Sequence, residues 1–242
     1  MCGFSGFISR DPDWGDPLSL LQQMGDQLHH RGPDDSGVWF DNDSKVGFAH
    51  RRLSVIDLSV QGRQPMFSVS GRFVIAYNGE IYNYQKLKKE LLQLGVPFRG
   101  NSDTEVLLAA IEYWGIKQAL QRFIGMFAFS LWDKKEQTLS LVRDRMGEKP
   151  LYYGWQGKGA KRTFLFGSEL KSLRQHPAWQ GGVDRDSLAN LLRYNYIPAP
   201  QSIHPGVFKL RPGYLLQLKK NDNGDWSERE ECWWSLQEVA QQ

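Results

Sequence analysis

A cysteine follows the first methionine of the chain. Removal of Met1 would leave Cys2 with both a thiol and a free α-amino group. The α-amino group titrates at about 7.7–8.0 and a thiol at about 8.5, so at neutral pH the amine is partly unprotonated and can take the thiol proton directly or through a water. Cys2 is therefore a candidate nucleophile that carries its own base.

Asn78-Gly79-Glu80 follow a predicted strand at 72–77 and precede a predicted helix at 84–94. We predict a turn at the strand end, where side chains and amides point into space rather than into the ladder. Attack on an amide carbonyl builds negative charge on its oxygen, and the Asn78 side-chain amide and the Gly79 N–H are a suitable pair of donors for that charge. A simple Asn-Gly turn is the structural alternative.

Two charged residues suit an amino-acid substrate. Arg52 lies just after a predicted strand at 46–49, and a guanidinium can capture a carboxylate through two hydrogen bonds. Its neighbour Arg51 could do the same, or both could be surface charges. Asp103 begins a predicted helix, where its carboxylate either caps the first turn or holds a substrate ammonium group.

The composition favours one large domain with a C-terminal extension and small, soluble partners. The chain has 242 residues, 40% of them hydrophobic, and a net charge of +3. No Lys/Arg run predicts a nucleic-acid or membrane patch, and no apolar stretch resembles a signal or a membrane span. Two distant cysteines fit a reducing cytoplasm. We predict no metal site, because none of the histidines has helical ligand spacing: His29, His30, His50, His176 and His204.

The elements that must position these residues follow an α+β pattern. Apolar runs bounded by turn residues predict strands at 3–8, 46–49, 72–77, 126–132, 139–143 and 164–167. Helices are predicted at 17–28, 84–94 and 184–192, and another starts at the capping-box pattern Ser102-Asp103-Thr104-Glu105. Because strands and helices come in blocks, we expect largely antiparallel sheets with helices outside.

Several segments, in this order, closely resemble the glutamine-dependent asparagine synthetases. Each segment alone is weak evidence for the family, but together the segments are very specific for it. They run through nearly the whole chain. They are Cys2-Gly3, His30–Asp34, Arg52–Asp57, Asn78–Asn83, Ser102–Glu105, Gly125–Phe129, Arg143–Tyr153, Phe166–Leu173, Tyr196–Pro200 and Lys209–Gly213.

The resemblance implies a class II glutamine amidotransferase domain with the N-terminal-nucleophile hydrolase fold, a four-layer αββα sandwich of two antiparallel sheets. By similarity, Cys2 attacks the side-chain amide of L-glutamine, Asn78 and Gly79 form the oxyanion hole, and a glutamyl thioester is hydrolysed to glutamate. Arg52, which matches the motif better than Arg51, would hold the α-carboxylate. The other implied pocket residues are Asp103, for the α-ammonium group, and Leu53, Ser54, Val55, Ile56 and Glu80.

The resemblance also implies a division of the chain and a set of partners. The amidotransferase domain would occupy residues 1–215, and an extension at 216–242 would lead to an ATP-dependent synthetase domain that this chain lacks. That domain would use ATP and Mg to activate aspartate and would receive the ammonia, whereas no cofactor is expected in this chain. Expected partners are L-glutamine and a synthetase domain in cis or in trans, with a homodimer left open and no nucleic acid or membrane.

Two alternatives compete with aspartate amidation. The same glutaminase chemistry could feed amidation of another carboxylate, such as a sugar acid, because acceptor choice resides in the synthetase domain. From a different class, the chain could be a non-catalytic module that binds a partner protein, and retention of Met1 would favour this, since an acylated amine cannot act as a base. Exposure of Trp233 and Trp234 would favour contact of the tail with the synthetase domain.

Overall fold

The computed structural model describes residues 1–9, 14–221 and 223–241. One sheet, called sheet 1, contains β1 (Gly3–Ser9), β2 (Asp35–Asp41), β3 (Val46–Arg52), β8 (Tyr152–Gln156), β9 (Thr163–Gly167) and β10 (Phe208–Lys209). The other, sheet 2, contains β4 (Met66–Phe67), β5 (Phe73–Ile81), β6 (Gly125–Asp133), β7 (Thr138–Arg143), β11 (Tyr214–Lys220) and β12 (Trp226–Cys232). The helices are α1 (Pro17–Asp26), α2 (Tyr84–Gln93), α3 (Asp103–Trp114), α4 (Ile116–Arg122), α5 (Leu170–Leu173), α6 (Arg185–Tyr194) and α7 (Leu236–Ala240).

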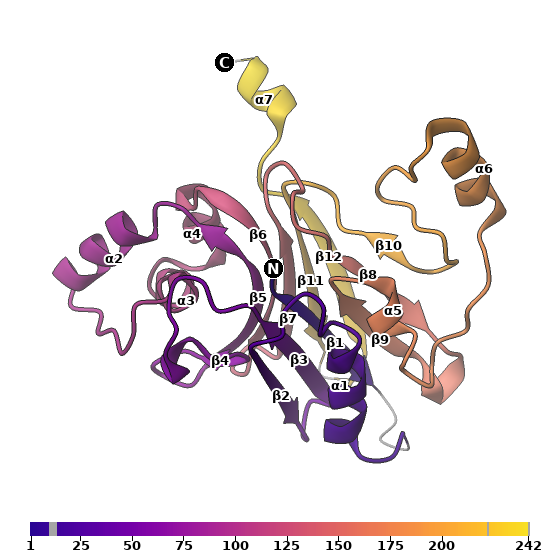
Figure 1. Ribbon diagram of the computed structural model, residues 1–242, viewed down its shortest axis with the longest axis horizontal. Helices are drawn as coiled ribbons and strands as arrows, with labels where there is room; N and C mark the ends of the chain where they lie inside the picture. Colours follow the sequence, from indigo (N-terminus) through magenta and orange to yellow (C-terminus); the bar gives the residue numbers. More distant parts are fainter. Residues whose placement is uncertain (10–13, 222, 242) are drawn as a thin grey trace.

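The two sheets stack face to face between helices. The strand order is β10-β8-β9-β1-β3-β2 in sheet 1 and β12-β11-β7-β6-β5-β4 in sheet 2. The pairings of β1 with β3 and of β5 with β6, which lie nearest the N-terminus, are antiparallel. Figure 1 shows α2, α3 and α4 on the outer side of sheet 2, with α1 and α5 beside sheet 1. The predicted αββα arrangement of two antiparallel sheets is confirmed.

Apolar side chains fill each interface between layers. Phe4, Phe48 and Trp132 are fully buried between the sheets. A second cluster packs sheet 2 against α2, α3 and α4, and a third, which includes Leu21, packs sheet 1 against α1 and α5. β1 is therefore an interior strand that is buried along its whole length. This places Cys2 at the start of a rigid element.

The prediction that Asn78-Gly79 form a turn after a strand is wrong. β5 continues to Ile81, and Asn78 and Gly79 pair with Ala128 and Phe127 of β6. A Cβ on Gly79 would overlap the main chain of Met126 and Phe127, so a glycine is needed for this close approach. The Asn-Gly pair therefore lies within a strand and allows β5 and β6 to approach closely, and the chain does not reverse there.

The capping-box prediction at the start of α3 holds only in part. The Ser102 hydroxyl accepts a hydrogen bond from Glu105 N–H (3.2 Å), as predicted. The Glu105 carboxylate instead accepts from the main-chain amides of Arg99 (2.6 Å) and Gly100 (2.9 Å). Asp103 is the first residue of α3, and its side chain is free for another role because Ser102 already supplies the cap.

The C-terminal segment continues sheet 2. The expected boundary between residues 215 and 216 lies inside β11, and β12 pairs with β11 along its length. Trp233 is 8% exposed and stacks on Phe127, with ring centroids 6.1 Å apart. Trp234 also packs against the helix-side core, so the tail contacts this domain.

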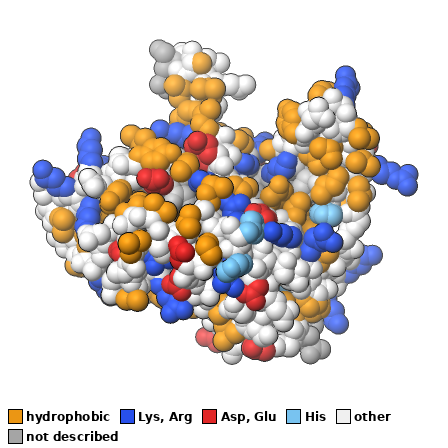
Figure 2. All heavy atoms as spheres, viewed as in Figure 1, with side chains coloured by type: hydrophobic (Ala, Val, Ile, Leu, Met, Phe, Trp, Pro, Cys, Tyr) orange, Lys and Arg blue, Asp and Glu red, His pale blue; other side chains and the backbone are white. Residues whose placement is uncertain are grey.

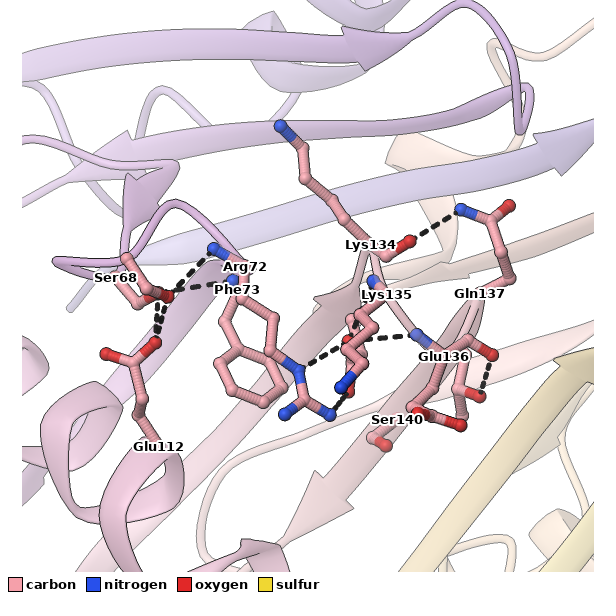
Figure 3. Close-up of polar contacts among 12 residues, drawn as sticks. Ser68, Arg72, Phe73, Glu112, Lys134, Lys135, Glu136, Gln137 and Ser140 are labelled. Carbon is pink, nitrogen blue, oxygen red and sulfur yellow. Dashed lines mark hydrogen bonds and ion pairs between the residues drawn. The ribbon is translucent and has the colours of Figure 1, made fainter.

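The β6–β7 hairpin depends on Asp133. Its carboxylate accepts from Arg72 Nε (2.9 Å) and Nη2 (2.6 Å) and from the main-chain amides of Lys135 (3.0 Å) and Glu136 (3.1 Å). Figure 3 shows Arg72 beside the turn that carries Lys135 and Glu136. We expect Asp133→Ala to lower the free energy of unfolding by about 2–4 kcal/mol, measured by urea denaturation, because these donors lose a charged acceptor. Asp43→Ala, on the exposed β2–β3 turn, is the control, and an equal loss in both variants would contradict this role.

Candidate functional site

A cavity of about 150 Å³ opens beside Cys2, where the start of β1 meets β5 of the other sheet. Its lining includes most of the predicted site residues: Cys2, Arg52, Leu53, Val55, Ile56, Asn78, Gly79, Glu80 and Asp103. Ser54 is not among the lining residues, and its main-chain N–H donates to the Asp34 carboxylate (2.8 Å). Other lining residues were not predicted as site residues, among them Gln64, Tyr77, Thr104, Met126 and Lys149.

The Cys2 thiol lies against the main chain of Leu53. Its Sγ accepts from Leu53 N–H (3.4 Å) and lies 3.7 Å from the Leu53 carbonyl oxygen. Burial raises the pKa of the Cys2 thiol, and this effect outweighs the stabilisation of the thiolate by Leu53, the chain's amino terminus and Arg52. The thiol is therefore protonated at neutral pH, and its reaction as a nucleophile requires a nearby base.

Met1 precedes Cys2 and lines the same cavity. It is 60% exposed, and its sulfur accepts from Lys149 Nζ (3.3 Å). Lys149 itself is buried. An exposed first residue is open to an aminopeptidase, and its loss would free the α-amino group of Cys2 inside the cavity.

The Asn78 side chain presents an unused donor to the cavity. Asn78 is 1% exposed, and within the described part of the chain its Nδ2 has no hydrogen-bond partner. A buried polar group without a partner costs about 1–3 kcal/mol, so such a group calls for an explanation. An acceptor on a bound ligand would satisfy it.

The Gly79 N–H is also turned away from its neighbouring strand. Gly79 lies opposite Phe127, whose N–H donates to the Asp144 carboxylate (3.1 Å) and whose carbonyl accepts from Asp144 N–H (2.8 Å). Both main-chain groups of Phe127 thus face β7. Gly79 and Phe127 form a non-hydrogen-bonded pair, so the Gly79 N–H points to the other edge of β5.

Side chains cover that edge of β5 on both sides of Gly79. Tyr77 N–H donates to Gln64 Oε1 (2.7 Å), and Ile81 N–H donates to Asp103 Oδ2 (3.0 Å). Gly79 lies between these two capped amides and lines the cavity. Its N–H and the Asn78 amide are therefore adjacent donors at the place where the Cys2 thiol is held.

Arg52 and Asp103 supply opposite charges to the cavity. Arg52 is 7% exposed and donates to the main-chain carbonyls of Ser59 (3.0 Å) and Asp57. These bonds use two of the five N–H donors of its guanidinium. Asp103 is 5% exposed and accepts from the Tyr77 hydroxyl (2.7 Å). Burial raises the pKa of Asp103 despite these hydrogen bonds, so a cationic partner would stabilise its ionised form.

Arg51 points elsewhere. Adjacent residues of a strand face opposite sides, and Arg51 pairs with Asp26 of α1 on the outer side of sheet 1. It is not among the residues that line the cavity. The structure thus separates the two arginines that the residue types alone left equivalent.

His50 joins the two sheets near the cavity. Its Nε2–H donates to the carbonyl of Tyr77 in β5 (2.9 Å). Complete burial lowers the pKa of His50 to about 4, so the imidazole is neutral at pH 7. His50 is not among the residues that line the cavity.

A family model described as "Glutamine amidotransferase domain" matches residues 1–234. The chain belongs to this family. The family is one of enzymes, and the match covers Cys2, the Asn78 and Gly79 donors and both charged residues of the cavity. It also extends through β12 to Trp234, consistent with the single sheet that β11 and β12 complete.

The relatives include asparagine synthetases. "Asparagine synthetase [glutamine-hydrolyzing] 3" of Bacillus subtilis is 37% identical in an alignment of 229 positions that covers 93% of this chain and 36% of the relative. "Amidase chry2" of Gibberella zeae is 34% identical in an alignment of 249 positions that covers 98% of this chain and 35% of the relative. The chain thus spans about a third of the length of these curated relatives.

The fold recurs in a solved amidotransferase. A glutamine phosphoribosylpyrophosphate amidotransferase of B. subtilis superposes with a TM-score of 0.67 at 20% identity, covering 97% of this chain and 50% of the other. This confirms the N-terminal-nucleophile hydrolase fold. In the described ranges, no helix is long and apolar enough to span a membrane, and no three His, Cys, Asp or Glu side chains gather as a metal site.

Proposed function

We propose that the chain, once Met1 is removed, hydrolyses L-glutamine to glutamate and ammonia through a thioester on Cys2. The observation that carries this proposal is the buried, unpartnered Asn78 amide, which lines the same cavity as the Cys2 thiol. Packing alone does not explain a buried donor without a partner. The oxyanion that forms from the carbonyl of an amide substrate would accept a hydrogen bond from this donor.

In the first half of the reaction, the free α-amine of Cys2 takes the thiol proton, and Sγ bonds to the side-chain carbonyl carbon of glutamine. The carbonyl oxygen becomes an oxyanion that Asn78 Nδ2 and Gly79 N–H stabilise. When the C–N bond breaks, the α-ammonium group returns its proton to the departing nitrogen, which leaves as ammonia. The second half repeats these steps with water, which cleaves the thioester to glutamate and restores the thiol.

Substrate affinity is assigned to Arg52 for the α-carboxylate and Asp103 for the α-ammonium group. We expect Arg52→Lys and Asp103→Asn each to raise KM for glutamine about 10–100-fold, since a lost charged hydrogen bond costs roughly 1.5–3 kcal/mol. kcat should change much less, because neither group touches the reacting amide. Initial rates over a range of glutamine concentrations measure both constants. Arg51→Lys is the matched control, and an equal rise in KM there would contradict the assignment.

We also propose that the ammonia passes to an ATP- and Mg-dependent synthetase domain, in cis or in trans, which amidates aspartate. The asparagine synthetases among the relatives support this proposal. The exposed apolar side chains on and after α6 offer a surface for such a domain: Leu188, Leu191, Leu192, Tyr194 and Tyr196. Figure 2 shows this apolar group at the upper right of the molecule.

Two assays test the proposed function. Purified, Met1-free protein is incubated with L-glutamine, and glutamate is measured with a coupled dehydrogenase; no release above a Cys2→Ala sample would refute the glutaminase. Acceptor choice is tested with the synthetase domain present, by supplying aspartate or a uronic acid with ATP and glutamine. Amidation of the uronic acid in place of aspartate would favour a sugar-acid pathway. We further propose a cytoplasmic location, in keeping with two free cysteines.

A further inference from the structure

We propose that Glu169 is a positioning residue for the nucleophile, which it controls by holding the Arg31 guanidinium on the main-chain carbonyl of Cys2. The inference rests on the proposed glutaminase function and adds residues that lie outside the cavity. Neither Arg31 nor Glu169 is among the lining residues.

The chain of contacts is direct. Arg31 Nε donates to the Cys2 carbonyl oxygen (2.9 Å), and Arg31 Nη1 donates to Glu169 Oε1 (2.8 Å). The Arg31 side chain is 9% exposed and that of Glu169 is 25% exposed. Because both partners are largely shielded from water, their ion pair is stronger than one on the surface.

Arg31 has no alternative anchor for its charged group. Its Nη2 is buried without a hydrogen-bond partner in the described residues, and Glu169 is the carboxylate recorded within ion-pair distance of it. Two hydrogen bonds, one to Cys2 and one to Glu169, therefore fix the plane of the guanidinium. Loss of Glu169 would leave a buried cation free to turn away from the Cys2 carbonyl.

Glu169 is itself held firmly. The same carboxylate contacts His30 Nε2 (3.0 Å) and lies 3.5 Å from Lys171 Nζ. The preceding residue, Ser168, accepts from Phe4 N–H (3.1 Å) and donates its own N–H to the Phe4 carbonyl (2.8 Å). The segment 168–169 is thus hydrogen-bonded to the start of β1 at two places, directly at Phe4 and through Arg31 at Cys2.

Gly3 makes room for this arrangement. A Cβ at Gly3 would lie 2.9 Å from Arg31 Cδ and 3.2 Å from Arg31 Nε. Any larger residue next to the nucleophile would push the guanidinium away from the Cys2 carbonyl. The requirement for glycine at position 3 follows from the same contact.

The consequence concerns the reaction more than substrate binding. The Cys2 carbonyl fixes the orientation of the Cys2 main chain, and with it the directions of the α-amine and of Sγ. Glutamine is held by other residues, so a displaced Cys2 would leave KM nearly unchanged and lower kcat. A displacement of about 1 Å can cost about 10²-fold in rate.

The first test compares Glu169→Ala, Glu169→Gln and Gly3→Ala with the wild-type chain. We expect Glu169→Ala and Gly3→Ala to lower kcat for glutamine hydrolysis about 10–100-fold, with KM within about threefold. Glu169→Gln, which keeps an acceptor for Arg31, should recover most of that loss. The matched control is Glu90→Ala, which removes a carboxylate paired with Arg122 (2.7 Å) on the far side of sheet 2 and should keep wild-type kcat.

The second test does not depend on activity. Cys2-Gly3 is the only Cys-Gly pair in the sequence, so carbonyl-carbon-labelled cysteine with nitrogen-labelled glycine gives one carbonyl–amide NMR signal, from that peptide. We expect the carbonyl shift to move in Glu169→Ala and to stay in place in Glu90→Ala. An unmoved signal overturns the inference whatever the activity, and so does an unchanged kcat in an active enzyme. If the wild-type chain releases no glutamate, the proposed function fails and the NMR signal alone decides the positioning role.

Discussion

Cys2→Ala is expected to abolish glutamate release, with a loss of at least about 10⁴-fold in kcat. Removal of a covalent nucleophile leaves only binding and oxyanion stabilisation, which accelerate hydrolysis far less than the complete site. Cys2 is the cysteine that lines the cavity, whereas Cys232 is exposed at the end of β12. No other thiol in the described residues can replace it.

The matched control for that variant is Cys232→Ala, which should retain wild-type activity. Circular dichroism and thermal unfolding of Cys2→Ala should match the wild-type protein, since the substitution removes one sulfur from a half-buried position. Persistent glutamate release by Cys2→Ala at more than a few per cent of the wild-type rate would show that hydrolysis uses another group.

The second large effect is expected for Asn78. Asn78→Ala should lower kcat about 10²–10³-fold, because one of the two oxyanion donors is lost. The same substitution should leave the melting temperature unchanged or raise it, because it removes a buried donor that has no partner in the free protein. A loss of activity without a loss of stability is the signature of a group that is kept for its ligand.

Asn78→Asp tests the same role with a smaller change of shape. The side chain keeps nearly the same shape but places an acceptor, and at neutral pH a negative charge, where the oxyanion forms, so the loss of kcat should exceed that of Asn78→Ala. A kcat within about threefold of wild type in either variant would remove Asn78 from the reaction. A large fall in melting temperature in Asn78→Ala would instead show that the amide is structural.

The sequence predicted the fold, and most of the predicted site residues line the cavity, because two kinds of signal were strong. Apolar runs bounded by turn residues located the cores of β1, β5, β6 and β7, and the order of the motifs identified the family. The types of Cys2, Arg52 and Asp103 indicated attack on an amide and capture of an amino acid. The structure places these residues in one cavity although they come from the position before β1, from the end of β3 and from the start of α3.

The errors arose where local preference and long-range pairing disagree. Asn-Gly favours a turn, yet strand pairing with β6 keeps Asn78 and Gly79 extended, and the pair becomes useful because Phe127 turns its main chain to Asp144. Glu105 stands at the capping-box position, but its carboxylate accepts hydrogen bonds from main-chain amides of the preceding loop. Neither Phe127 nor the loop could be placed beside these residues from sequence spacing.

Arg31 and Glu169 show a second limit. Both lie in motifs that carried the resemblance. Their contact joins residues 138 positions apart, through a guanidinium that also reaches Cys2. A pattern of residue types gives no distance between such positions, so their coupling emerges only from the packed structure.

The central claim is that Cys2 is a nucleophile in a formed glutamine pocket. The most direct measurement is the intact mass of the Met1-free protein before and after incubation with a diazoketone analogue of glutamine, which alkylates an attacking thiol. We predict one adduct, located on Cys2 by peptide mapping and prevented by excess L-glutamine. No adduct, or an adduct on Cys2 that glutamine does not prevent, would contradict the account.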